Sequence, residues 1–247
     1  MSELVSLVTG ASRGIGRAIA LRLAARGHHV VVNFRSDEAA ASQTLQAIVE
    51  AGGTGELAQA DVSDRTQAKA LVRAVKASKG RLDVLVNNAG VVHEELFFFT
   101  SVERFWEVMQ TNLGGVVNVT KSAIPLLGKH KSGRVVNMAS IAGLHGTTGL
   151  SAYATSKAAV IGLSKVLARE LAASGVRVNV VAPGLVQSDM TDDLERPELH
   201  ERALGKQPVP RMGTADEVAA VVEFLACDAP DYLTGNVVRV DGGSMIG

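Results

Sequence analysis

A tyrosine and a lysine four residues apart are the side chains in this sequence best suited to proton transfer. Tyr153 and Lys157 lie in the run Tyr-Ala-Thr-Ser-Lys, and Ser140 precedes them. Four residues make about one helical turn, so both side chains would share one face of a helix. A phenol with a pKa of about 10 transfers protons poorly at neutral pH. We expect the neighbouring cation to lower the pKa of Tyr153 and make it usable for acid–base chemistry.

A glycine-rich turn near the N-terminus is the candidate nucleotide site. The run Thr-Gly-Ala-Ser-Arg-Gly-Ile-Gly begins at Thr9, between an expected strand and an expected helix. Glycines permit a tight turn and a close approach to a ligand, and N–H groups at a helix start bind pyrophosphate. The spacing differs from the usual G-x-G-x-x-G, and such a turn alone is also compatible with a purely structural role. The residues expected to contact a cofactor are Gly10, Ser12, Arg13, Gly14, Ile15 and Gly16.

The end of the second expected strand indicates which dinucleotide binds. An acidic side chain there would bind a ribose 2′-hydroxyl, whereas an arginine nearby favours a 2′-phosphate. The strand ends with Asn33, and Arg35 follows it, while Arg13 lies in the glycine turn. Guanidinium groups suit phosphate because they donate two parallel hydrogen bonds. We therefore expect NADP(H), although Asp37 and the alternative of two solvated surface arginines keep NAD open.

Short β-branched runs alternate with longer helical patterns along nearly the whole chain. Most of the short runs are almost continuously apolar, as expected for strands covered on both faces. The alternation predicts the α/β class: a three-layer doubly wound Rossmann fold with a seven-stranded parallel sheet. No linker divides residues 1–247, so we expect one domain. The expected strands are 5–9, 30–33, 56–60, 84–87, 135–138, 178–182 and 237–240, and the expected helices are 14–26, 37–51, 64–79, 101–128, 151–173 and 214–227.

Two connections, 91–100 and 184–213, are long for a fold of this class. Both follow expected strands, so both should lie over the carboxyl edge of the sheet, where ligands bind. The stretch 188–207 is a candidate lid over a substrate. The first connection carries Phe97, Phe98 and Phe99, and Phe105 and Trp106 follow it. These aromatic residues suit helix packing, a subunit interface or contact with a substrate.

Composition argues against several other classes of protein. Lysine and arginine total 25, as do aspartate and glutamate, so the formal net charge is zero. A nucleic-acid binder or a protein bound to an anionic membrane should be basic. The single cysteine, Cys227, forms no internal disulfide, and the chain has no Cys/His spacing typical of a metal site. No secretory signal or apolar run of about 20 residues is present, so we expect a cytoplasmic protein.

In the order and spacing of these motifs the chain resembles the short-chain dehydrogenase/reductase family, from about Leu4 to Gly243. Within that family it is most similar to the β-ketoacyl-(acyl-carrier-protein) reductases. The resemblance implies further site residues. Asp61 and Val62 would contact adenine; Asn88, Ala89 and Gly90 would flank the cofactor; Asn112 would be a fourth catalytic residue; and Pro183, Gly184, Val186 and Ser188 would cover the nicotinamide.

The resemblance also implies a mechanism. NADPH would deliver hydride to a ketone carbon while Tyr153 donates a proton to its oxygen. Ser140 would hydrogen-bond the same oxygen and steady the developing charge. Lys157 would lower the pKa of Tyr153 and hold the nicotinamide ribose. Asn112 would anchor a water molecule that supplies protons to Lys157.

For the substrate, the resemblance implies a β-ketoacyl thioester on an acyl-carrier protein or another thioester carrier, and it implies a homotetramer. An acidic carrier needs a basic patch near the active-site mouth, for which Lys129, Lys131 and Arg134 are candidates. Ser174 departs from a basic position that we associate with these reductases. The fold alone does not choose a substrate. Reduction of another ketone, NAD-dependent oxidation of a secondary alcohol, and a non-catalytic NADP-binding regulator remain alternatives.

Overall fold

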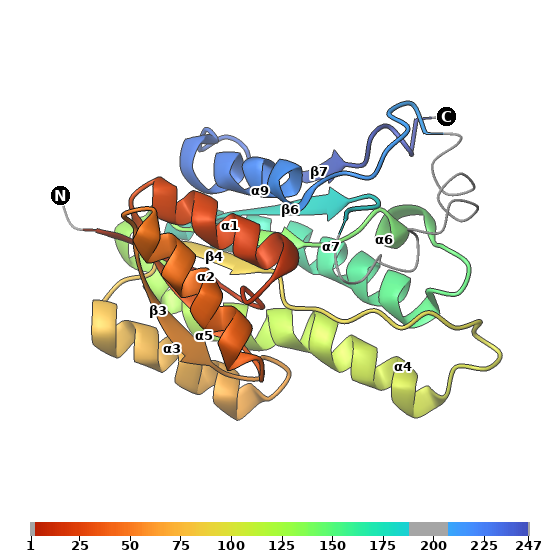
Figure 1. Ribbon diagram of the computed structural model, residues 1–247, viewed down its shortest axis with the longest axis horizontal. Coiled ribbons are helices and arrows are strands. Elements are labelled where there is room, and N and C mark those ends of the chain that lie inside the picture. The colour runs from red at the N-terminus through yellow and green to blue at the C-terminus, as the bar shows by residue number, and fades with distance from the viewer. Residues whose placement is uncertain (1–2, 188–206, 247) are drawn as a thin grey trace.

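Seven parallel strands form the central sheet of the computed structural model, which describes residues 3–187 and 207–246 (Figure 1). Apart from Gln207, the expected lid lies outside the described residues, as does Ser188. The strand order is β3-β2-β1-β4-β5-β6-β7, and every neighbouring pair is parallel. The strands are β1 (Leu4–Val8), β2 (His28–Phe34), β3 (Thr54–Gln59), β4 (Val84–Asn87), β5 (Arg134–Met138), β6 (Arg177–Pro183) and β7 (Val237–Val240).

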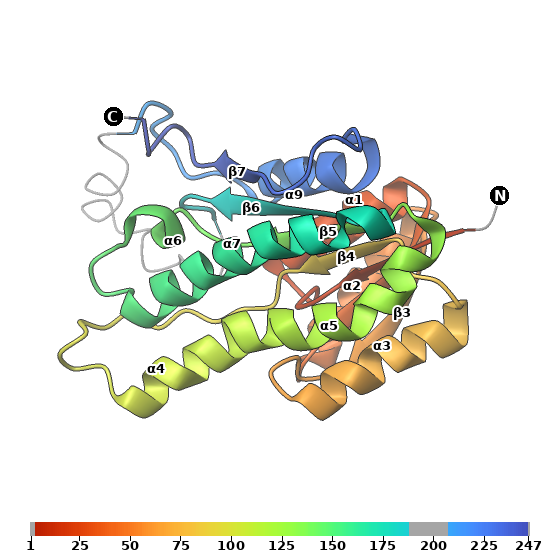
Figure 2. The ribbon, with the colours of Figure 1, turned by 180° about the vertical axis from the view of Figure 1, so that it is seen from behind.

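Helices cover both faces of this sheet, which confirms the predicted doubly wound Rossmann fold. Figures 1 and 2 show α1, α2 and α9 on one face and α3, α5 and α7 on the other. The main helices are α1 (Gly14–Ala25), α2 (Glu38–Glu50), α3 (Arg65–Lys79), α4 (Val102–Met109), α5 (Gly115–Leu127), α7 (Ser151–Leu171) and α9 (Ala215–Glu223). The shorter helical segments are η1 (Gln110–Gly114), η2 (Gly128–His130), α6 (Ala142–His145), η3 (Ala172–Ser174) and η5 (Phe224–Asp228).

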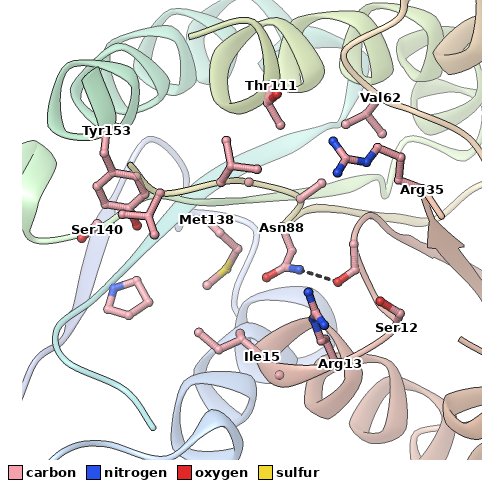
Figure 3. Close-up of a pocket in the computed structure, with 18 of the residues that line it drawn as sticks. Ser12, Arg13, Ile15, Arg35, Val62, Asn88, Thr111, Met138, Ser140 and Tyr153 are labelled. Carbon is pink, nitrogen blue, oxygen red and sulfur yellow. Dashed lines mark hydrogen bonds between the residues drawn. The ribbon is translucent and has the colours of Figure 1, made fainter. Parts of the chain in front are cut away.

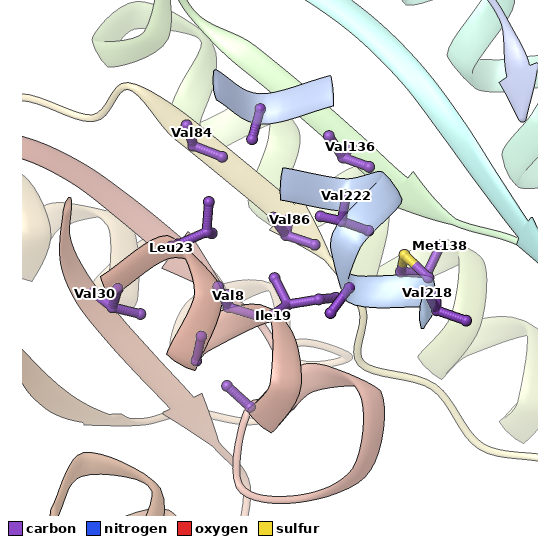
Figure 4. Close-up of a cluster of buried hydrophobic side chains, with 14 of the residues drawn as sticks. Val8, Ile19, Leu23, Val30, Val84, Val86, Val136, Met138, Val218 and Val222 are labelled. Atoms are coloured by element: carbon purple, nitrogen blue, oxygen red, sulfur yellow. The ribbon is translucent and has the colours of Figure 1, made fainter. Parts of the chain in front are cut away.

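Burial on both faces explains why the strands read as continuous apolar runs. Successive side chains of a strand point to opposite faces. In β1, Val8 packs with the core under α1, α2 and α9, whereas Leu7 packs with the core under α3, α5 and α7. Figure 4 shows the first core, where Ile19 and Leu23 of α1 meet the valines of the sheet. The inner strands therefore need an apolar side chain at most positions, whereas the edge strand β3 is only partly buried and carries Thr54, Glu56 and Gln59.

The expected single helix 101–128 contains a π-helical turn. The segments α4, η1 and α5 follow one another without a break, and the backbone widens only at Gln110–Gly114. The small helix α6 was not expected, because four residues carry no readable helical period. Neither it nor any other helix within 3–187 or 207–246 has the length and apolarity needed to span a bilayer.

The strand order reverses beside β1, whose two neighbours are β2 and β4. The connections that leave β1 and β4 go to opposite faces of the sheet, so a crevice forms between the carboxyl ends of these two strands. This topology alone selects where a ligand can enter.

Two histidines at the start of β2 predict how stability varies with pH. His28 is buried with its Nδ1 2.7 Å from the Ser6 hydroxyl, and burial lowers its pKa. Burial, followed by the charge of Lys79, also lowers the pKa of His29. Both histidines become protonated near pH 6.5 in the unfolded chain, but only at a lower pH in the folded protein. The free energy of unfolding should therefore fall as the pH drops below about 6.5.

Urea unfolding at pH 7.5 and 5.5 tests this expectation. His28→Gln should reduce the loss of stability between the two pH values, because it removes one of the two groups whose pKa is lowered by folding. His130→Gln, at an exposed site, is the matched control and should keep the wild-type loss. Equal pH dependence in both variants would contradict the assignment.

Candidate active site

A cavity of about 500 Å³ occupies the crevice at the carboxyl edge of the sheet (Figure 3). Its walls come from the turns after β1 to β6, segments far apart in the sequence. Asn112 does not line the cavity. The expected site residues that do are Gly10, Ser12, Arg13, Gly14, Ile15, Gly16, Asn33, Arg35, Asp61, Val62, Asn88, Ala89, Gly90, Ser140, Tyr153, Lys157, Pro183, Gly184 and Val186.

The glycine turn lies against the turn after β4. Gly10 has a φ of +61°, and a Cβ atom there would lie 2.9 Å from the Cα of Ala89. A Cβ atom on Gly16 would lie 2.2 Å from the Gly10 carbonyl oxygen and 2.5 Å from Nδ2 of Asn88. Only glycine fits at these two positions.

Two asparagine amides hold this turn in place. Nδ2 of Asn88 donates to the carbonyl oxygens of Thr9 and Gly10, both at 3.0 Å. Asn33 accepts from the Gly10 N–H and donates to the Ala58 carbonyl oxygen. Nδ2 of Asn88 and both amide atoms of Asn33 are thus used to hold the shape of the turn.

The start of α1 is suited to a phosphate. Arg13 occupies the position before the helix and its side chain makes no capping hydrogen bond. The helices α2, α3, α4 and α9 do have side-chain caps. The first N–H groups of α1 therefore have no side-chain acceptor at the cap position, at the positive end of the helix dipole.

The arginines flank one end of the cavity, as Figure 3 shows for Arg13, Arg35 and the neighbouring Ser12. Asp37 lines the same end, so a carboxylate is present there as well. That carboxylate caps α2 by accepting from the Ala40 N–H, and it lies 4.0 Å from Arg13.

The other end of the cavity holds the proton-transfer candidates. Tyr153 and Lys157 lie one turn apart on α7, as predicted. The Tyr153 hydroxyl is hydrogen-bonded to Ser140, whose Oγ also accepts from the Ala142 N–H at 3.1 Å. Nζ of Lys157 lies 5.6 Å from the centre of the Tyr153 ring and donates to the Met138 carbonyl oxygen at 3.0 Å.

The pKa of Tyr153 shifts in the direction opposite to the one expected from the sequence. Burial raises the pKa of Tyr153, and the hydrogen bond to Ser140 only partly opposes this. Burial also lowers the pKa of Lys157 to about 8. Both groups lose water, which favours the neutral forms. The spacing of the pair predicted the position of the cation but not the desolvation of the site.

Asn112 braces the wall behind the cavity. It lies in the π-helical turn η1 and is fully buried; its amide pairs with both backbone groups of Val91, at 2.8 and 2.9 Å. Its Nδ2 also donates to Ser156 of α7 at 3.0 Å. A Cβ atom on Gly90 would lie 3.2 Å from Oδ1 of Asn112 and 3.3 Å from Nζ of Lys157. The two polar groups thus approach the same small space.

The same helical turn reaches the far end of the cavity. Nε2 of Gln110 donates to the Ser63 carbonyl oxygen at 2.9 Å. Ser63 in turn donates through its N–H and its hydroxyl to the carboxylate of Asp61. The turn that carries Asp61 and Val62 is therefore tied to η1.

Several lining residues were missed. Thr111 precedes the expected Asn112, and Val91 and Val92 follow the expected Gly90, so adjacency was a usable signal. Met138, Leu185, Glu94 and Leu150 also line the cavity. Glu94 and Leu150 had no local signal, because they meet through the pairing of Glu95 with Leu150.

The expected basic patch lies at the wrong edge of the sheet. Arg134 opens β5, and Lys129 donates to the Gly80 carbonyl oxygen near the start of β4. The helix α5 runs back against the strand direction, so its last residues reach the amino edge, opposite the cavity. In one chain these residues do not border the mouth. The aromatic residues Phe97, Phe98, Phe99, Phe105 and Trp106 do not line the cavity either.

Comparison with known proteins agrees with this geometry. The family model described as enoyl-(acyl carrier protein) reductase matches residues 10–245. This chain belongs to the short-chain dehydrogenase/reductase family. Membership implies a nicotinamide cofactor, and the glycine turn, the start of α1 and the paired arginines fit one. No group of three or more metal-binding side chains occurs in the described part of the chain.

Relatives within the family are similar over nearly their whole length. The 3-oxoacyl-(acyl-carrier-protein) reductase FabG of Staphylococcus aureus is 43% identical over 96% of each chain. The corresponding reductase of Synechocystis sp. is 43% identical over 100% of this chain and 98% of its own. A crystal structure assigned as a gluconate dehydrogenase from Agrobacterium tumefaciens superposes with a TM-score of 0.96 at 27% identity, covering 100% of this chain and 97% of that one.

Adding a methyl group at Gly16 tests the close packing of the glycine turn against its neighbours. Gly16→Ala should lower the free energy of unfolding by about 1–3 kcal/mol, as overpacking does, and should weaken dinucleotide binding. In Gly162→Ala, the added Cβ meets no atom within 4 Å. This control should be neutral or more stable by up to about 1 kcal/mol. Chemical unfolding and dinucleotide titration measure both; a Gly16→Ala protein matching the control would refute the close contact.

Proposed function

We propose that this protein reduces a β-ketoacyl thioester, carried on an acyl-carrier protein, to the β-hydroxyacyl thioester with NADPH, as a step of fatty-acid synthesis. The observation that carries the proposal is the meeting of Ser140, Tyr153 and Lys157 at one end of a cavity whose other end suits a dinucleotide phosphate. The names of the relatives at 40–43% identity support the substrate class.

A nicotinamide held in this cavity would supply hydride for the ketone carbon. Tyr153 donates its phenolic proton to the ketone oxygen, and the raised pKa keeps that proton on the phenol until it is needed. Ser140 donates a hydrogen bond to the same oxygen and stabilises its developing charge. The phenolate left behind is stabilised by the cationic form of Lys157 nearby.

Lys157 and Asn112 complete the proposed proton path. Lys157 would hold the nicotinamide ribose through Nζ, which Met138 already orients. With a pKa of about 8, the ammonium gives up and regains a proton near neutral pH. The space beside Gly90 brings Asn112 and Lys157 close enough to share a water molecule. We propose this water as the route by which Tyr153 is reprotonated.

The cofactor preference rests on the arginine pair. Arg13 and Arg35 face one end of the cavity, where the 2′-phosphate of NADPH would bind. Asp37 is engaged as the cap of α2, so it competes weakly for the ribose. We therefore propose NADPH over NADH. Asp61, Val62, Ala89, Pro183, Gly184 and Val186 would complete the contacts to the cofactor.

A second candidate is the oxidation or reduction of another alcohol or ketone. The neighbour assigned as a gluconate dehydrogenase favours it, because the two folds match closely. For assembly, we propose one domain per chain and a homotetramer. Exposed apolar side chains on and before α4, including Phe98 at 89% and Trp106 at 61% exposure, support association between chains.

Removal of the proposed proton donor tests the mechanism. Tyr153→Phe should lower kcat for an acetoacetyl thioester by about 10²–10⁴-fold, the usual contribution of a general acid, and leave NADPH affinity within about twofold. Tyr232→Phe is the matched control at the other tyrosine, which is 99% exposed, and should keep wild-type turnover. Undiminished kcat in Tyr153→Phe would overturn the assignment.

Removal of one arginine tests the cofactor. Arg35→Ala should reduce the preference for NADPH over NADH by about tenfold or more, since a hydrogen bond to a charged group contributes about 1.5–3 kcal/mol. Arg17→Ala, an exposed position on α1 outside the cavity lining, should leave the preference unchanged. Steady-state kcat/KM for both cofactors gives the ratio. A wild-type preference for NADH would contradict the arginine argument directly.

A further inference from the structure

The end of the cavity that holds Ser140 and Tyr153 also carries a carboxylate that the proposed mechanism does not use. Glu94 lines the cavity. It follows β4 by a short stretch of chain and packs beside Gly149: a Cβ there would lie 3.5 Å from Cγ of Glu94 and 4.0 Å from its Oε1. The side chain is exposed, so its carboxylate is open to a ligand.

Backbone pairing fixes Glu94 relative to the reacting groups. The next residue, Glu95, donates its N–H to the Gly149 carbonyl oxygen at 2.8 Å and pairs with Leu150. Leu150 occupies the position just before α7, three residues before Tyr153, and lines the cavity. The amino end of a helix favours a nearby negative charge. Glu94 is therefore attached to the same helix start that positions Tyr153.

Charge is distributed unevenly along the cavity. The end proposed for phosphate has Arg13 and Arg35, with Asp37 and Asp61 engaged as a helix cap and in a turn. At the other end, Glu94 and Lys157 are the charged residues among the described lining. Lys157 is buried behind Tyr153, whereas Glu94 is exposed. A ligand that extends outward from Tyr153 therefore meets a negative charge.

This charge distinguishes two forms of a β-keto substrate. In a free β-keto acid, a carboxylate stands two carbons from the ketone. In the thioester, a neutral carbonyl and sulfur replace it, followed by a carrier arm with amide N–H groups. A carboxylate beside Glu94 is repelled, whereas an N–H donor gains a charge-assisted hydrogen bond. The carboxylate of Glu94 thus attracts the N–H of the thioester arm and repels the carboxylate of the free acid.

We propose that Glu94 is a specificity-determining residue that accepts a hydrogen bond from an amide N–H of the thioester arm and excludes free β-keto acids. This inference rests on the proposed reduction of a thioester and adds which group of the substrate is recognised. Glu94 takes no part in proton transfer, so its effect falls on substrate binding.

The test compares a neutral thioester with the corresponding free acid. The probes are the acetoacetyl thioester of N-acetylcysteamine, which keeps one amide N–H of the arm, and acetoacetate as a competitive inhibitor. Glu94→Gln should raise KM for the thioester and lower the inhibition constant of acetoacetate. Together these changes should lower the ratio of the acetoacetate inhibition constant to the thioester KM, which measures discrimination, by about tenfold. This is the scale of one lost charged contact, and kcat should be nearly unchanged. Glu94→Lys should lower this ratio further.

Glu95→Gln is the matched control. It makes the same chemical change in the next residue, whose carboxylate contacts His93 and does not line the cavity. Its discrimination should stay within about twofold of wild type, the range usual for a surface change.

Two outcomes overturn different claims. If Glu94→Gln and Glu94→Lys reduce the thioester with wild-type KM and bind acetoacetate no more tightly, the role of Glu94 is wrong and the proposed reaction stands. If the wild-type protein reduces neither this thioester nor a carrier-bound one with NADPH, the proposed reaction itself fails, and the role of Glu94 with it.

Discussion

The close contact between the turns after β1 and β4 is the constraint on which the site depends. Asn88 spans the two turns with a pair of backbone hydrogen bonds, and Gly16 leaves no room for a side chain between them. This contact holds the glycine turn against the turn after β4, and both turns line the cavity.

Desolvation has opposite effects on the two titrating groups of α7. It keeps the proton on Tyr153 and makes it easier to remove from Lys157. A reductase needs a phenol that is protonated when the ketone arrives and a phenolate that is stabilised afterwards. The neutral phenol meets the first need, and Lys157, which with a pKa of about 8 is still mostly cationic at neutral pH, meets the second.

Local patterns were sufficient for the fold. Apolar strand runs, the glycine turn and the Tyr153–Lys157 spacing depend on neighbours in sequence, and each appeared where expected. Properties that depend on chain direction or on distant segments were harder. The patch at Lys129 was misplaced because a helix after a parallel strand ends at the opposite edge. The direction of the pKa shift of Tyr153 was predicted wrongly, because burial depends on the tertiary structure. Glu94 was missed because its partner, Gly149, lies on another loop.

The π-helical turn between α4 and α5 has a mechanical consequence. This turn carries Gln110, which holds the turn of Asp61, and Asn112, which holds the backbone beside Lys157. The two ends of the cavity therefore share one stretch of helical backbone as a support. A substitution that removed this π-helical turn would therefore shift supporting side chains at both ends of the cavity.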